Sequence, residues 1–284
     1  MSATAAAGGL RFRRPSAVPG FGPAFGIAAT GVTLLVLAPL AALVLRAAGQ
    51  SWGEFAAAAF SPRALAAYRL SFGASALAAL VNLVVGLLLA WVLVRYRFPL
   101  RRVADALVDL PFALPTAVAG VALTAICAPD GLAGRVAAEF GVKLAFTPTG
   151  VFIALLFIGL PYVVRTVQPV LADLEPELEE AAALLGASRW RTVTRVVLPA
   201  LAPAAAAGLA LAFARSVGEY GSVIFIAGNV PMVSEIAPLL VVVQLEEYDY
   251  GAATAIAAVL LAASLVLLAI GAVLQRRLER EGAR

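Results

Sequence analysis

Six apolar runs, each close to the length that crosses a lipid bilayer, constrain this 284-residue chain more than any other feature. They occupy residues 25–45, 70–94, 110–128, 149–164, 200–226 and 252–274. A spanning helix needs about 20 predominantly apolar residues, and tilt or flanking side chains accommodate a shorter run. A seventh stretch, residues 236–245, has roughly half that length and predicts a short helix on or near the membrane surface. The runs therefore predict an all-α integral membrane protein with six transmembrane helices.

Composition excludes most other classes of protein. Hydrophobic residues make up 62% and charged residues 13% of the chain, whereas soluble domains average about 45–50% and about 25%. This excludes a soluble enzyme, a nucleic-acid reader and a disordered chain. Histidine is absent and Cys127 is the only cysteine, so no Cys/His zinc site, Cys–His nucleophile or internal disulfide can form. We expect Cys127 to be a buried packing residue, and we expect no catalytic residue, metal or cofactor.

The basic residues predict the orientation. Fifteen of the 21 lysines and arginines lie in the terminal segments and in the second and fourth connections, five lie in the other connections, and Arg215 lies inside a run. Because Lys and Arg gather on the cytoplasmic side, both termini are expected there. The predicted organisation is a cytoplasmic tail over 1–24, a six-span domain over 25–274 and a cytoplasmic tail over 275–284. The first run is too long for a typical signal peptide, although small residues near Ala47 leave cleavage there open.

The fourth connection, residues 165–199, begins with the pattern of an amphipathic helix. Pro176 suits a first helical turn, and the acidic residues that follow it suit the positive end of a helix. Leu178, Ala182 and Leu185 recur at helical spacing and form one apolar stripe. The connection therefore predicts an acidic, amphipathic helix outside the membrane.

A glycine corner and a second helix are predicted next. Gly186 stands where a helix ends in the left-handed conformation, and Ser188 can cap a short basic helix that Pro199 ends. Such a hairpin either rests in lipid headgroups or contacts a partner protein. Anionic lipid repels the acidic first helix, which favours a protein partner there, whereas the basic second helix suits either.

One pattern in this connection carries a resemblance. It consists of Glu180, Ala181, Ala182, Gly186, Val196, Leu198 and Pro199. It resembles the EAA loop of ABC-importer permeases, which reads EAA, three residues, G, nine residues, I, one residue and LP, and only Val196 departs from it. The resemblance implies the type I importer permease fold, with the EAA helix, including Leu178 and Leu185, inserted into a groove of a separate ATPase. The chain itself has no GxxxxGK[ST] phosphate-binding loop.

Three further stretches narrow the resemblance. Residues 18–30, 110–123 and 213–229 are similar to the sulfate/thiosulfate group of these permeases, and the PGFG in the first favours its T-type subunit over the W-type partner. The implied assembly is a heterodimer with a W-like permease subunit, two cytoplasmic ATPase subunits and an extracytoplasmic sulfate-binding protein, set in lipid of the bacterial inner membrane. No nucleic-acid partner is expected.

Charged residues inside the fifth run predict a polar site. Arg215 and Glu219 are four residues apart, on one face of the expected helix, and charges at that depth rarely face lipid. One reading is a salt bridge that fixes helix packing. The other is a translocation path in which Arg215 attracts a divalent anion and Glu219 weakens that attraction, so that the anion can leave. Tyr220, Gly218 and Gly221 then provide a close approach or a bend at the gate.

The start of the third run predicts a solvated helix end. Asp105 follows Arg101 by four residues, which favours an ion pair between them, and Asp109 is nearby. Two prolines in the run predict a kink. Arg165 is expected to snorkel at the end of the fourth run.

Three alternatives remain at this point. The first is a permease for a related oxyanion, molybdate or tungstate, since a separate binding protein does most of the selecting in importers of this type. The second is a stand-alone secondary anion transporter, which commonly has an inverted repeat or several intramembrane carboxylates; the sequence shows one such carboxylate and no repeat. The third is a membrane enzyme, for which no nucleophile–base pair or metal set is found.

Overall fold

The computed structural model describes residues 21–282, and every regular element in that part of the chain is helical. The chain divides into two units, Met1–Arg46 and Ala47–Arg284. The first apolar helix consists of α1 (Phe21–Val32), the π turn η1 (Thr33–Leu37) and α2 (Ala38–Ala48). Apart from residues 21–24, the predicted N-terminal tail lies outside the described residues.

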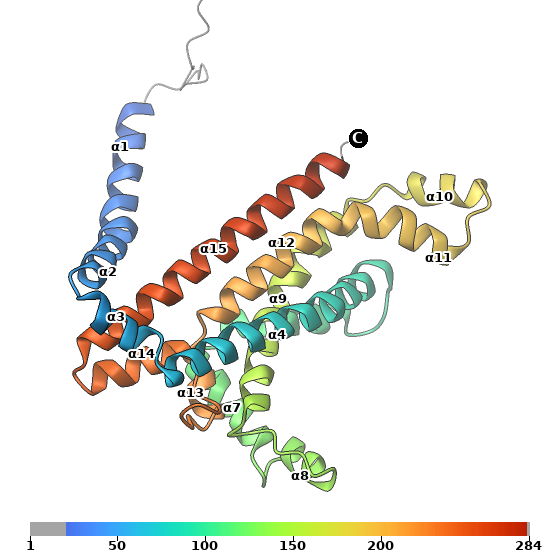
Figure 1. The fold of residues 1–284 in the computed structure, drawn as a ribbon. Coiled ribbons are helices and arrows are strands. Elements are labelled where there is room, and N and C mark those ends of the chain that lie inside the picture. The colour runs from blue at the N-terminus through green and yellow to red at the C-terminus, as the bar shows by residue number, and fades with distance from the viewer. Residues whose placement is uncertain (1–20, 283–284) are drawn as a thin grey trace, which may run out of the picture. The chain divides into compact units, whose positions relative to one another are not determined.

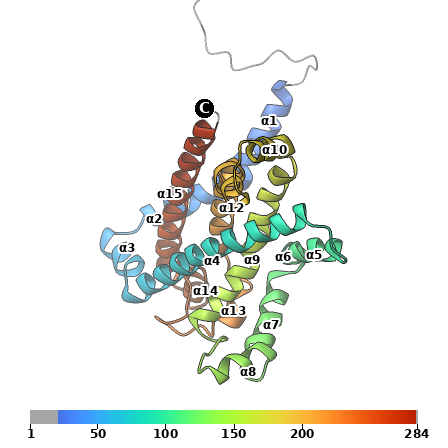
Figure 2. The same cartoon turned by 90° about the vertical axis from the view of Figure 1, so that its right-hand side faces the viewer.

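The second unit contains the remaining helices. In chain order they are α3 (Trp52–Ala59), α4 (Pro62–Arg95), α5 (Arg101–Val108), α6 (Leu110–Ala113), α7 (Thr116–Cys127), α8 (Leu132–Glu139), α9 (Pro148–Ala172), α10 (Pro176–Leu184), α11 (Arg189–Thr192), η2 (Val193–Val197), α12 (Leu198–Val217), α13 (Val223–Ile226), α14 (Ala237–Glu246) and α15 (Tyr250–Gly282). Within this unit α4, α9 and α12 pack together, with α10 and α11 at one end and α7 and α8 at the other (Figures 1 and 2).

Among the described residues, five helices are long and apolar enough to cross a bilayer, and a sixth span results if α7 and α8 count as one bent pair. This confirms the all-α membrane architecture. Cys127 is buried, as predicted for a packing residue.

Small residues bring the central helices close together. Val163 of α9 is fully buried between Gly86 of α4 and Gly208 of α12. A methyl group at Gly86 would lie 2.7 Å from Cγ1 of Val163, and one at Gly208 would lie 3.0 Å from its Cα. Only glycine leaves room for this packing, because in lipid helices associate mainly through close van der Waals contact.

The kink predicted in the third run, residues 110–128, is confirmed, and it is a full break in the helix. The run breaks after α6, because Leu114 is extended (ψ 136°) and Pro115 follows it. A residue before proline avoids the α-helical conformation, and proline itself has no N–H for the helix. The remainder, α7, has 12 residues, and α8 continues it at an angle of 42°.

The fifth run differs at both ends from the prediction of 200–226. The helix stops at Val217, and α13 is a separate turn. At the other end Pro199 does not end a helix, since residues 189–217 form one continuous 29-residue segment. The π turn η2 directly precedes Pro199, and the Leu198 N–H donates to the carbonyl of Val193. This wider turn avoids the clash that a proline ring makes with an α-helical carbonyl four residues earlier.

The seventh stretch forms the predicted short helix, α14. Ala237, Leu239 and Leu240 are buried, and α14 packs against α15 and α4. Its position relative to the membrane surface stays a prediction. The last helix, α15, continues to Gly282, so the predicted tail from 275 is helical as far as the structure describes it.

Candidate functional site

The hairpin between α9 and α12 has the predicted helix, corner and second helix. Gly186 has a φ of +76°. The Ala187 N–H donates to the Ala182 carbonyl at 3.0 Å, and the Gly186 N–H donates to the Ala183 carbonyl at 2.9 Å. This pair of bonds is a Schellman motif, which closes a helix through a left-handed residue. The corner is therefore a defined turn in which the EAA segment supplies the carbonyls.

The cap predicted at Ser188 is confirmed, whereas α10 begins without a side-chain cap. Ser188 caps α11, since its hydroxyl accepts from the Arg191 N–H at 3.4 Å. Glu175 occupies the N-cap of α10 without a side-chain cap bond. The acidic first turn of α10, Glu177 and Glu179, still faces the positive end of the helix dipole.

Large apolar side chains are exposed around the corner. Leu184 and Leu185 are each 89% exposed and Trp190 is 75% exposed. Leu178 is also exposed, whereas Ala182 is half-buried. Leu184 is not part of the predicted stripe, although its position beside Leu185, just before the corner glycine, indicates that it belongs to the same exposed surface. Such a patch on a hairpin end marks a contact surface.

An ion pair that local sequence patterns do not reveal ties this hairpin to α4. The guanidinium of Arg95, at the end of α4, donates to the carboxylate of Glu179 in α10. Arg95 also lies over the ring of Trp91, 5.6 Å from its centroid. The acidic face of α10 is thus held by the basic end of a neighbouring spanning helix.

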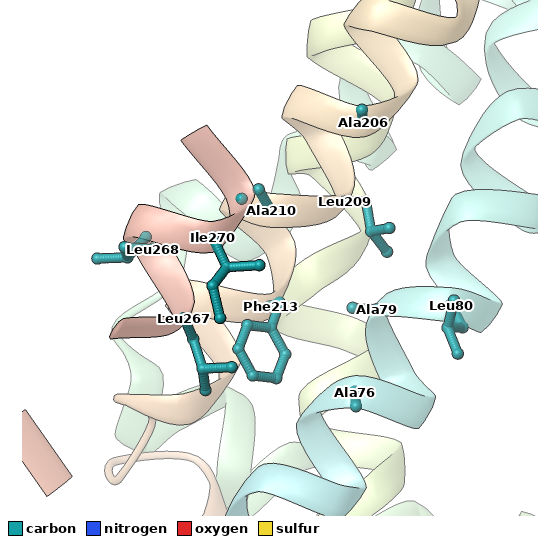
Figure 3. Close-up of a pocket in the computed structure, with 11 residues that line it drawn as sticks. Ala76, Ala79, Leu80, Ala206, Leu209, Ala210, Phe213, Leu267, Leu268 and Ile270 are labelled. Carbon is teal, nitrogen blue, oxygen red and sulfur yellow. The ribbon is translucent and has the colours of Figure 1, made fainter. Parts of the chain in front are cut away.

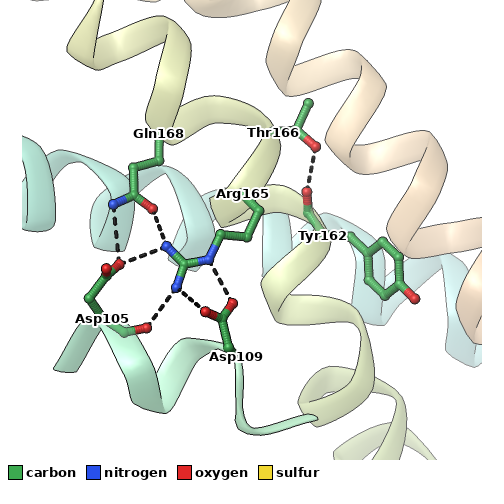
Figure 4. A network of polar contacts seen from close by, with 6 residues as sticks. All are labelled: Asp105, Asp109, Tyr162, Arg165, Thr166 and Gln168. Atoms are coloured by element: carbon green, nitrogen blue, oxygen red, sulfur yellow. Dashed lines mark hydrogen bonds and ion pairs between the residues drawn. The ribbon is translucent and has the colours of Figure 1, made fainter. Parts of the chain in front are cut away.

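A second polar network joins α5 to α9 (Figure 4). Arg165 donates to both carboxylate oxygens of Asp109, to Oδ1 of Asp105 and to the Asp105 carbonyl, each at 2.7 Å. Gln168 accepts from Arg165 at 2.6 Å and donates to Asp105 at 3.2 Å. The hydrogen bond from Arg165 lowers the pKa of Asp105 below its ordinary value.

This network corrects two predictions. Arg165 does not snorkel at a helix end, because α9 continues to Ala172. Asp105 pairs with Arg165 rather than with Arg101, which is its neighbour in sequence. The planar guanidinium of Arg165 satisfies two carboxylates at once, and a single i, i+4 contact on the helix surface cannot compete with that geometry.

The charged pair of the fifth run forms the predicted salt bridge. Nη1 of Arg215 lies 2.6 Å from Oε2 of Glu219. The other oxygen of Glu219 accepts from the N–H and the hydroxyl of Ser222, each at 2.8 Å. The Glu219 side chain is 2% exposed and that of Arg215 is 31% exposed. Glu219 therefore faces the interior of this chain and only Arg215 is accessible.

The backbone around this pair is broken. Glu219 lies beyond Gly218, the C-cap of α12, rather than on the helix as we predicted. Gly221 makes a close approach to α7, since a methyl group there would lie 2.2 Å from Oγ1 of Thr116. Tyr220 is half-buried against the apolar core, and a methyl group at Gly218 would make only an ordinary contact, 3.9 Å from the carbonyl oxygen of Ala214. The expected close approach is thus made by Gly221.

An apolar groove lies between α4, α12 and α15 (Figure 3). Its volume is about 300 Å³ and it includes Ala79, Phe213 and Leu267. None of the side chains that line it is charged or polar, so it offers no contact for an anion. Within residues 21–282 no group of three or more Asp, Glu, Cys or His residues is placed to hold a metal.

The sequence is similar to a known protein family and to curated members of it. The sequence matches the family described as "Binding-protein-dependent transport system inner membrane component" over residues 82–281. It is 49% identical over 263 residues to the sulfate transport system permease protein CysT of Escherichia coli (strain K12), covering 93% of this chain and 95% of the relative. The protein of the same name from Synechocystis sp. is 50% identical over 243 residues, covering 86% and 85%.

Solved structures agree with the fold. A bacterial ABC transporter that imports the acidic polysaccharide alginate matches with a TM-score of 0.74 at 17% identity, over 90% of this chain and 96% of that chain. The same kind of transporter, in complex with an alginate pentasaccharide-bound periplasmic protein, matches with a TM-score of 0.75 at 17% identity, over 90% and 94%. At this identity the likeness concerns the fold alone.

Proposed function

The chain belongs to the family of binding-protein-dependent transport system inner membrane components, and on this premise we propose that it is the permease subunit of an ATP-driven sulfate importer. The relatives that carry the proposal are sulfate permeases that match over 85–95% of their own length. Thiosulfate is expected to share the path, because it is a tetrahedral divalent anion of similar size. Hydrolysis of ATP takes place on a different chain.

The hairpin is the proposed contact with that ATPase. Leu184, Leu185 and Trp190 present apolar surface at its end, and a groove on a soluble subunit would bury it. The residues assigned to coupling are Leu178, Glu180, Ala181, Ala182, Leu185, Gly186, Leu198 and Pro199. The Schellman corner supports this role because it fixes the angle between α10 and α11.

Two connections carry motion from the hairpin into the membrane. Residues 189–217 form one helix of 29 residues, about 43 Å long at the α-helical rise, so a displacement near Trp190 moves the end at Arg215. The ion pair between Arg95 and Glu179 transmits the same displacement to α4. We assign alternating access to the joint movement of α4 and α12.

Arg215 is the proposed anion contact of this chain. It is the one charge of the fifth run that remains accessible, and it lies where α12 ends at a backbone break. Glu219 holds the guanidinium in place and reduces its net charge, so that sulfate binds weakly enough to leave. In this proposal Glu219 is a positioning residue, and Gly218 and Tyr220 line the bend beside it.

The remaining assembly is proposed from the family. It comprises a second, W-like permease subunit, two cytoplasmic ATPase subunits and an extracytoplasmic sulfate-binding protein. Both termini and the hairpin are placed in the cytoplasm, which the distribution of Lys and Arg supports.

Uptake by the whole complex tests the function. Proteoliposomes that contain this chain, its partner permease and the ATPase should accumulate radiolabelled sulfate only with the binding protein outside and ATP inside. Unlabelled thiosulfate should compete, whereas molybdate and tungstate should not, because the added sulfate-binding protein selects the anion before it reaches the path. Uptake that persists with a catalytically dead ATPase would contradict the proposal of an ATP-driven importer. Competition by molybdate alone would identify molybdate rather than sulfate as the transported anion.

A further inference from the structure

The short helix α5 is amphipathic, and the carboxylates on its polar face pair with α9 while they remain 41% and 48% exposed. Asp105 and Asp109 lie on that face and are bound to Arg165 of α9. The opposite side carries Val103 and Leu107 of α5 together with the flanking Leu100 and Leu110, and these four are 51%, 58%, 75% and 39% exposed. A helix at a water-facing surface has the reverse arrangement. The exposed face of α5 is therefore suited to an apolar environment.

Two arginines stand at the start of this helix without a direct contact to a carboxylate, although the charge of Arg101 helps to lower the pKa of Asp105. Arg101 and Arg102 are exposed, and within the part of the chain that the structure describes neither side chain makes a hydrogen bond or an ion pair. The two nearby carboxylates are occupied by Arg165. In this cluster the arginines, Arg101, Arg102 and Arg165, outnumber the carboxylates, Asp105 and Asp109, so its net charge is positive.

A hollow brings the two features together. Phe98, Leu100, Arg101, Arg102, Val103 and Asp105 line a cavity of about 670 Å³ at the turn between α4 and α5. Leu100 has a φ of +65°, which is unusual for a residue other than glycine. This strained turn holds an apolar side chain outward, and such strain often marks a functional site. The cavity thus has an apolar wall beside two guanidinium groups, and the one carboxylate that lines it, Asp105, is paired with Arg165.

We propose that α5 and the turn before it bind an anionic phospholipid, with Arg101 and Arg102 on the headgroup phosphate and Leu100, Val103 and Leu107 against the acyl chains. The apolar face continues through Leu110 into the third run, which sets the arginines at the level of the headgroups. Basic residues next to a spanning segment attract anionic lipid by charge and by hydrogen bonds to phosphate. The site is separate from Arg215 and from the exposed end of the hairpin.

Equilibrium lipid binding tests the site. The full chain, purified in a non-ionic detergent, is titrated with fluorescent phosphatidylglycerol and with phosphatidylcholine of the same acyl chains. Phosphatidylglycerol should bind, and the double variant Arg101→Gln/Arg102→Gln should bind it about 30-fold more weakly, as expected for the loss of two charges at a membrane surface. Arg101→Lys/Arg102→Lys should retain most of the affinity.

A matched control removes two charges elsewhere. Arg69→Gln/Lys143→Gln alters two exposed basic residues away from α5 and should leave binding unchanged. Equal affinity for both lipids, or equal binding by wild type and the Arg101→Gln/Arg102→Gln variant, would overturn the proposal. Displacement of the lipid by inorganic sulfate or phosphate would assign the arginines to a soluble anion, and displacement by the ATPase subunits would assign the surface to a protein. Either result would also overturn it.

Discussion

Gly186 is the residue whose backbone conformation most restricts its identity. Its φ of +76° costs a residue with a Cβ roughly 1–2 kcal/mol, and a β-branched side chain more. Gly186→Val should therefore distort the corner between α10 and α11 and lower ATP-driven uptake several-fold, while the chain still inserts. Gly186→Asn should retain most of the uptake, because asparagine tolerates this conformation. Uptake by the Val variant equal to wild type would show that the corner angle is unimportant for coupling.

Arg215 and Glu219 must be tested together. Replacing Arg215 alone leaves a buried carboxylate without its partner, at a cost of roughly 3–5 kcal/mol, so a loss of uptake would have two explanations. Arg215→Gln/Glu219→Gln keeps the size and removes both charges. If Arg215 contacts the anion, the double variant should assemble with the ATPase yet lose more than tenfold in sulfate uptake. Normal uptake would leave the pair with a packing role only.

Asp105 gives the α5–α9 network a defined pH dependence. Its pKa in the folded chain is lowered by Arg165, so the unfolded chain takes up the proton first as pH falls. The stabilisation is then complete above the ordinary aspartate pKa, near 4, and is lost progressively as the pH falls from there through the lower pKa of the folded chain. The difference in Tm between wild type and Asp105→Asn should be constant from pH 6 to 8 and should shrink below about pH 4. A difference that persists at the lowest pH would exclude the ion pair as its cause.

At the scale of helices, the connection between α10 and α4 rests on one ion pair. Arg95→Glu places a negative charge opposite Glu179 and should separate the two helices, which lowers the sulfate uptake obtained per ATP hydrolysed. Glu179→Arg should have a similar effect, and the exchanged pair Arg95→Glu/Glu179→Arg should recover much of the loss. The ratio of uptake to ATP hydrolysis measures this. If the exchanged pair is as defective as the singles, the charge pairing does not transmit the motion.

The helices show how far local sequence determines this fold. Apolar length located the spans, and the positions of Gly186 and Ser188 located the corner and a cap, because these signals depend on neighbouring residues. Local patterns predict a kink in the third run and a helix end at Pro199, yet the kink at Pro115 is a full break and Pro199 lies inside a continuous helix after a π turn. Whether a proline breaks a helix or lies within it depends on how the surrounding helix packs, and the proline itself does not determine that packing.

The missed contacts have a common cause. Arg95 and Glu179 are 84 residues apart, and Arg165 and Asp109 are 56 apart. Helical periodicity relates residues three or four apart, so it favoured Arg101 as the partner of Asp105. The exposed side of Arg215 and the burial of Glu219 also depend on α7 and Ser222, which only the folded chain brings to that point.

The whole molecule is predicted to expose its two ends to opposite sides of the membrane. Leu184 is at the hairpin end, and Phe140, which is 78% exposed, follows α8 at the other end (Figure 1). Cys127 is the only native cysteine and is buried, so Cys127→Ala provides a background for single labels. In intact cells a membrane-impermeant thiol reagent should label Phe140→Cys and not Leu184→Cys. In inside-out vesicles stripped of the ATPase the pattern should reverse. Adding the ATPase back should then protect Leu184→Cys from the reagent, since the proposed contact covers it. Labelling of Leu184→Cys from outside intact cells would show that the topology is the reverse of the one predicted, and the coupling proposal would lose its basis.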